Sequence, residues 1–113
     1  MRDARERLHD MVDAIDRVEQ YAARGHASFV ADELIQVWIV HHLQILGEAA
    51  SQLGRDFHSE HPVVPWPQIV AMRNILVHDY FGIDLDEVWN VVAHELPDLK
   101  AALVAMLASL GPD

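Results

Sequence analysis

Apolar residues recur every three or four positions over most of the chain, which is the period of a helix packed on one side. The first such segment runs from about Asp3 to Ala23, and Gly25 follows as a residue suited to end a helix. The second starts near Ser28, a suitable N-cap, and ends at Gly54. Its apolar face covers about half of the circumference, which is more than one neighbouring helix requires. We therefore expect this helix to pack on its own domain and also on a second subunit.

Prolines mark the start of the third helix. Because residues 54–67 contain three prolines, we expect a connection without regular structure there. The third helix begins at Pro65 and Pro67, where a missing N–H costs little. If it continues to Tyr80, the phenol lies on the same line of the helix as Arg73.

The last apolar segment predicts a kinked helix. Asp84, with Glu87 three residues later, forms a capping box at its start. The apolar phase is kept through Pro97 to the end of the segment, so a bend is expected near that proline. With no strand pattern in the sequence, the predicted fold is an all-α, four- to five-helix up-and-down bundle. It forms one domain over residues 1–113.

Composition and charge narrow the possible functions. There is no cysteine, which excludes disulfides and thiolate metal sites and is compatible with a reducing cytoplasm. No signal peptide or long apolar span is visible, so we expect a cytoplasmic protein outside the membrane. Acidic residues outnumber basic ones 18 to 8, giving a net charge of −10. A nucleic-acid binder with this charge needs a small local basic patch, and a basic protein partner would be attracted to the acidic surface.

Candidate chemistry is concentrated near the end of the third helix. Arg73, Asn74, His78 and Tyr80 lie within eight residues. Asn74 and His78 are one helical turn apart on the side opposite the core, and Arg73 lies on the flank. Arginine binds phosphate oxygens in a bidentate way, and histidine is the side chain that titrates near neutral pH. The core-facing arc of this helix is expected to hold Ile69, Met72, Ile75 and Leu76.

Three further positions bear on this group. Gly47 lies inside the second helix, where glycine costs about 1 kcal/mol relative to alanine but permits close approach of another backbone. Glu48 beside it is expected to pair with an arginine, and Arg73 is the candidate. Asp79 either tunes His78 or faces solvent at the helix end.

The other histidines do not predict a metal site. His41 and His42 are adjacent, so from a helix they cannot both face one metal, and we expect them in packing or an interface. His58 and His61 have a spacing that some metal sites use, but no suitable further ligands accompany them.

These residues resemble a known family. Arg73, His78 and Tyr80 match the RxxxxHxY signature of the HEPN superfamily. The longer pattern from Pro65, Pro-Trp-x-x-Ile-x-x-Met-Arg-Asn-x-Leu-x-His-x-Tyr, is similar to its HepT branch, the ribonuclease toxins encoded beside small MNT-type nucleotidyltransferase antitoxins. The resemblance covers most of the chain from about residue 28 onward and includes residues 47–49 and 83–99.

The resemblance implies a metal-independent endoribonuclease toxin without a cofactor, acting on tRNA or mRNA. Two protomers of a homodimer, or of a higher even oligomer, would set Arg73, Asn74 and His78 from both chains face to face in one composite site. It also implies that a cognate MNT antitoxin neutralises the toxin by transferring AMP to Tyr80. Added negative charge beside the arginine would then repel RNA.

Two alternatives come from other classes of protein. One is a non-catalytic HEPN bundle that binds a nucleotidyltransferase through its acidic surface. The other is a helical module that binds a nucleotide through Arg73.

Overall fold

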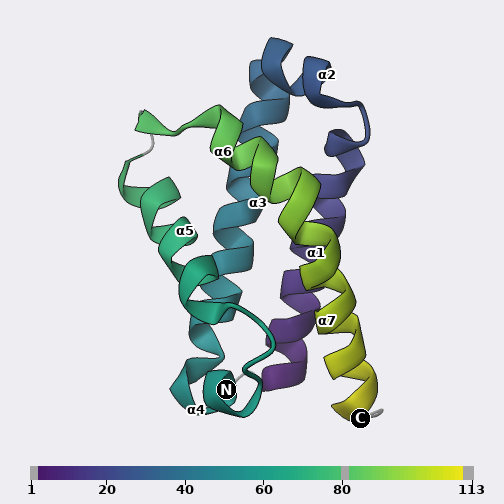
Figure 1. Cartoon of the computed structure of the whole chain (residues 1–113), viewed down its shortest axis with the longest axis vertical. Coiled ribbons are helices and arrows are strands. Elements are labelled where there is room, and N and C mark those ends of the chain that lie inside the picture. The colour runs from purple at the N-terminus through teal and green to yellow at the C-terminus, as the bar shows by residue number, and fades with distance from the viewer. Residues whose placement is uncertain (1–2, 80–81, 111–113) are drawn as a thin grey trace.

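Residues 3–79 and 82–110 are described by a computed structural model, and every regular element within them is helical (Figure 1). The all-α prediction is therefore confirmed. None of the helices in this part of the chain is both long and apolar enough to span a bilayer. In chain order the elements are α1 (Ala4–Ala22), α2 (His26–Ala31), α3 (Glu33–Gln52), α4 (Gly54–Glu60), α5 (Trp66–His78), α6 (Leu85–Asn90), the π-helix η2 (Val91–Glu95) and α7 (Leu96–Leu110).

Four long helical runs alternate in direction, as the up-and-down prediction requires (Figure 1). They are α1, α3, α5 and the continuous run from α6 through η2 to α7. α3 packs on α1 at one side and on α5 at the other, while α7 packs on α1. The first and last turns meet at one end of the bundle, where Arg5 Nη2 donates to the carbonyl of Leu110 at 3.2 Å. The core between the runs is apolar, with no buried polar or charged residue among those described.

The second predicted helix is divided in two, so the prediction of one helix from Ser28 to Gly54 was wrong at its start. Asp32 adopts an extended conformation (φ −121°, ψ 107°), and its side chain accepts from the N–H of Leu34 as the N-cap of α3. Gln36 Nε2 then donates to the carbonyls of Phe29 and Val30 in the last turn of α2. These bonds compensate for the interrupted helical ladder. The apolar pattern continues across the break and therefore hides it.

The connection before α5 contains a short helix, α4, which corrects the prediction of an irregular segment over residues 54–67. His58 joins α4 to the neighbouring helices. Its Nε2 is 2.7 Å from the carbonyl of Ala50, and its ring stacks on Trp66 at 4.7 Å between centroids. His61 stacks on Phe57 and accepts the indole N–H of Trp66 at its carbonyl. Both histidines therefore have packing roles, and no group of side chains in the described residues could hold a metal ion.

The C-terminal run begins at the predicted cap and is distorted before Pro97. The side chain of Asp84 accepts from the N–H groups of Asp86 and Glu87. The run continues to Leu110, as expected, but its irregularity is a π-helical turn that ends at Glu95, two residues before the proline. Because proline donates no N–H, the regular ladder cannot be kept there, and the N–H of Leu96 bonds to Val91 instead.

Lys100 links α7 to α1. Its Nζ lies 2.8 Å from Asp16 Oδ1 and 2.8 Å from Glu19 Oε1. These hydrogen bonds, first to Asp16 and then to Glu19, raise the pKa of the Lys100 ammonium above its ordinary value. The contact holds the C-terminal helix against α1.

Candidate phosphate-binding site

Helix α5 presents the motif, but its orientation differs from the predicted one. Ile69 and Leu76 are buried, as expected, whereas Ile75 is 58% exposed and the prediction that it faces the core was wrong. Arg73 lies on the side of α5 that faces α3. The inward arc therefore includes the arginine stem, which turns Ile75 and Val77 toward solvent. Long arginine stems pack well on apolar surface while the charged end stays in contact with water.

Gly47 makes this orientation possible. It is buried in α3 directly opposite Arg73. A Cβ placed on Gly47 would lie 2.8 Å from Arg73 Cγ and 3.3 Å from Arg73 Cα, and closer still to Arg73 Cβ. Ordinary carbon contacts are about 3.5–4.0 Å. The predicted close approach of another backbone is thus present, and the backbone concerned is that of the motif helix.

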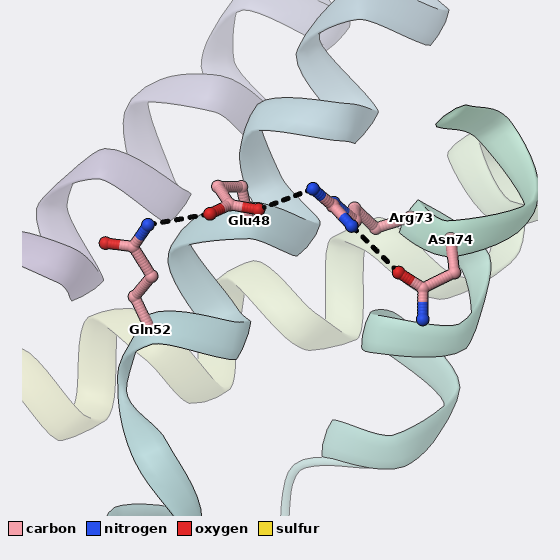
Figure 2. A network of polar contacts seen from close by, with 4 residues as sticks. All are labelled: Glu48, Gln52, Arg73 and Asn74. Atoms are coloured by element: carbon pink, nitrogen blue, oxygen red, sulfur yellow. Dashed lines mark hydrogen bonds and ion pairs between the residues drawn. The ribbon is translucent and has the colours of Figure 1, made fainter. Parts of the chain in front are cut away.

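A polar network fixes the guanidinium (Figure 2). Arg73 Nη2 lies 2.9 Å from Glu48 Oε2, and Arg73 Nη1 donates to Asn74 Oδ1 at 2.9 Å. Gln52 Nε2 donates to the other carboxylate oxygen of Glu48 at 2.6 Å. The predicted ion pair between Glu48 and Arg73 is therefore present. A guanidinium has five N–H donors, and residues 3–79 and 82–110 accept two of those of Arg73, so three have no partner within that part of the chain.

His78 and Asp79 lie at the end of α5. His78 is exposed one turn after Asn74, on the same side of the helix, and its side chain makes no hydrogen bond or ion pair within residues 3–79 and 82–110. Asp79 caps the helix through its N–H, which bonds to Ile75, and its side chain is exposed beside Gly82. Within the described residues no hydrogen bond or ion pair joins the side chains of Asp79 and His78, and the Asp79 side chain faces solvent, as the second alternative expected. Tyr80 lies outside the described residues.

Two glutamines of α3 also contribute, and the sequence analysis missed both. Gln52 holds Glu48, and Gln44 Nε2 donates to the carbonyl of Leu76 in the last turns of α5 at 3.0 Å. Each lies four residues from Glu48, so a search for side chains on the same helical face could have found them.

An exposed apolar stripe runs along α3 toward this network. Leu34 is 80% exposed, Val37 44% and Ile45 38%, and the exposed His41 completes a spacing of three, four and four residues. His42 is turned inward and lies 2.8 Å from the carbonyl of Trp38. The predicted second apolar side of this helix is therefore present at the surface.

The fold and this site define a helical bundle that carries a half-buried arginine beside an exposed amide and an exposed imidazole on one helix. Comparison with known proteins identifies its family. The chain belongs to the family described as ribonuclease HepT-like, whose model matches residues 11–106. The resemblance found in the sequence is thereby confirmed, and the match includes the whole of α3 and α5.

Two archaeal relatives have similar lengths. "Probable ribonuclease HepT" of Thermococcus cleftensis is 34% identical over 94 residues, covering 82% of this chain and 86% of the relative. "Putative RNase MJ1380" of Methanocaldococcus jannaschii is 33% identical over 100 residues, covering 88% of this chain and 92% of the relative. No solved structure gives a significant match.

Proposed function

We propose that this chain is a metal-independent endoribonuclease whose active site is completed by a second copy of the chain. The observation that carries the proposal is the exposed surface of α5, where Arg73 is fixed by Glu48 and Asn74 while three of its N–H donors remain. His78 is one turn further along the same helix and is exposed. Membership of the HepT-like ribonuclease family supports the same chemistry.

The proposed reaction is transfer of a phosphoryl ester within the RNA chain. A base removes the proton of a 2′-hydroxyl, and the 2′-oxygen attacks the adjacent phosphorus. Arg73 stabilises the charge of the five-coordinate phosphorane. The bond to the 5′-oxygen breaks, and an acid protonates this leaving oxygen. The products are a 2′,3′-cyclic phosphate and a 5′-hydroxyl, with no net change in protons.

A second copy supplies what one chain lacks. The reaction needs both a base and an acid, and the motif contains one imidazole, that of His78. In a homodimer, or in a higher even oligomer, His78 of one copy serves as base and His78 of the other as acid. The exposed stripe of α3 supports this assembly, because solvent-exposed apolar stripes of this kind mark interfaces. With RNA as its substrate, the proposed enzyme acts in the cytoplasm on tRNA or mRNA.

Tyr80 is the proposed site of control. We infer that a cognate MNT-type nucleotidyltransferase transfers AMP from ATP to the Tyr80 hydroxyl, forming a phosphodiester to the tyrosine and releasing pyrophosphate. The added phosphate places negative charge two residues beyond His78 and repels the RNA backbone. The chain is then the toxin of a toxin–antitoxin pair. Tyr80→Phe should remain unmodified and active under conditions that modify and silence the wild type.

The deciding experiment is cleavage of total tRNA and of a defined mRNA in EDTA, after intact-mass analysis has shown an unmodified sample. His78→Ala is compared with His9→Ala, which removes an exposed histidine of α1 as a matched control. Cleavage by the wild type and by His9→Ala, and none by His78→Ala, is expected. Full activity of His78→Ala would refute the assignment.

The net charge of −10 favours a second candidate, a non-catalytic bundle that binds a nucleotidyltransferase. A stable complex with the nucleotidyltransferase, together with no cleavage by unmodified protein on any RNA tested, would select it.

A further inference from the structure

A groove separates α5 from the C-terminal run. Its volume is about 390 Å³. Ile69 and Met72 line it from α5, while Leu99 and Ala102 line it from α7. Figure 1 shows the reason for the opening, since α5 and α7 lie on opposite sides of the view with α3 and α1 between them. α5 packs on α3 and α7 packs on α1, and these two helices do not close on each other.

The groove is mostly apolar, and part of its lining is solvent-exposed. Val63, in the segment before α5, is 78% exposed and lies at its edge. Met72 and Ala102 are only partly buried. Exposed apolar surface that is contiguous and bordered by polar residues is typical of a protein interaction site.

The charged part of the lining has one sign. Glu95 and Asp98 are exposed where η2 meets α7, with His94 beside them. Among the residues that the structure describes, no lysine or arginine lines the groove. The chain as a whole carries 18 acidic residues against 8 basic ones, so a second copy would bring like charge to this edge. The occupant that complements the groove is therefore apolar on one face and basic beside it.

We propose that this groove binds a basic amphipathic helix of a partner protein. Apolar side chains three or four residues apart would enter between α5 and α7, and flanking lysines or arginines would pair with Glu95 and Asp98. The occupant would touch Met72, the residue next to Arg73, so binding bears directly on the motif helix. This docking surface is separate from the α3 stripe that we assign to self-association, and it does not depend on ribonuclease activity.

The test uses two synthetic peptide probes with the full chain. Both carry leucines at helical spacing on one face, and the flanking positions are lysines in one and glutamates in the other. The lysine probe should bind saturably by fluorescence anisotropy, and the glutamate probe at least about tenfold more weakly. Amide chemical shifts should change on both sides of the groove, around Ile69 and Leu99.

Matched variants locate the contact. Asp98→Lys should weaken binding of the lysine probe at least about fivefold. Asp13→Lys, an equal charge reversal on the exposed face of α1, should have little effect on that binding. Ala102→Phe should fill the groove and abolish binding, while Ala101→Phe on the neighbouring exposed position should not. Circular dichroism confirms that each variant is folded.

Three outcomes would overturn the proposal. The first is equal binding of the two probes, and the second is shift changes confined to the α3 stripe. The third is a change of oligomeric mass in Ala102→Phe alone, which would make the groove an interface between copies of this chain.

Discussion

Replacing Gly47 by alanine tests whether the close approach of α3 and α5 holds the motif in place. The added methyl group would lie 2.8 Å from Arg73 Cγ, against an ordinary contact of about 3.5–4.0 Å. Arg73 Cβ would be closer still, and because the backbone sets the position of both Cβ atoms, no rotamer change can relieve that contact. The two helices must therefore separate by about 1 Å at this point. A displacement of about 1 Å at a catalytic group can lower the rate by about 100-fold.

The expected stability change follows from two opposing effects. Alanine in place of glycine inside a helix is favourable by about 1 kcal/mol. Overpacking of a well-packed contact costs about 1–3 kcal/mol. Gly47→Ala should therefore be neutral to about 2 kcal/mol less stable, and its RNA cleavage should fall by far more than its stability explains.

A double-mutant cycle separates the contact from helix propensity. The conflict persists in Arg73→Ala, which keeps its Cβ, and is relieved in Arg73→Gly, which does not. In the Arg73→Gly background, Gly47→Ala should therefore become stabilising, with a coupling energy of about 1–3 kcal/mol between the two positions. Urea denaturation at one fixed protein concentration measures all four proteins. A coupling energy near zero, or a Gly47→Ala protein as active as the wild type, would refute the reasoning.

Three further predictions concern an ion pair between helices, the exposed stripe of α3 and the partner of Arg73. Lys100→Met should destabilise the protein at pH 7. The pKa of Lys100 is higher in the folded protein than in the unfolded chain, so its charge contributes stability below the ordinary lysine pKa of about 10.4, and this contribution is lost as the pH rises toward the folded-state pKa. The difference in melting temperature between wild type and variant should therefore shrink above about pH 10.4. Ile45→Glu should give a lower oligomeric mass by light scattering, whereas Val104→Glu, at another exposed apolar position on α7, should leave the mass unchanged. Glu48→Ala should lower kcat about tenfold by freeing the arginine, and Glu48→Gln, which can still accept its hydrogen bond, should recover most of that loss without a change in melting temperature.

Apolar periodicity was sufficient to predict the long helices, because each of them buries one face. It fails where local polar bonds determine where a helix begins or ends. Asp32 interrupts a segment whose apolar pattern is continuous, and the break depends on the bonds that Asp32 and Gln36 make to backbone groups. α4 carries little apolar periodicity, and its position is held by His58 through one carbonyl bond and one ring stack. Neither arrangement is visible in residue spacing alone.

The candidate site was also predicted only in part. Gly47 and Glu48 indicated a close approach and an ion pair, and both are present. The predicted orientation of α5 was wrong at Ile75, because apolar periodicity assigns isoleucines to the buried side of a helix and arginines to the exposed side. The space that Gly47 leaves for the Arg73 stem is a property of the pair of helices, and a single helix does not contain that information.

The charge of the chain leads to a quantitative prediction about RNA binding. The motif cation, Arg73, is already paired with Glu48, and the net charge is −10. We therefore expect phosphate contacts from the two motif arginines of a dimer and few others. Two contacts to single-stranded RNA give a slope of about −1.4 for log K against log salt concentration. The slope is measured with the non-cleaving His78→Ala protein at salt concentrations from about 50 to about 200 mM. Arg73→Gln should bring the slope close to zero. A slope of about −4 or steeper would mean that basic residues outside the motif also bind the RNA phosphates. The composite site would then be only part of the RNA-binding surface.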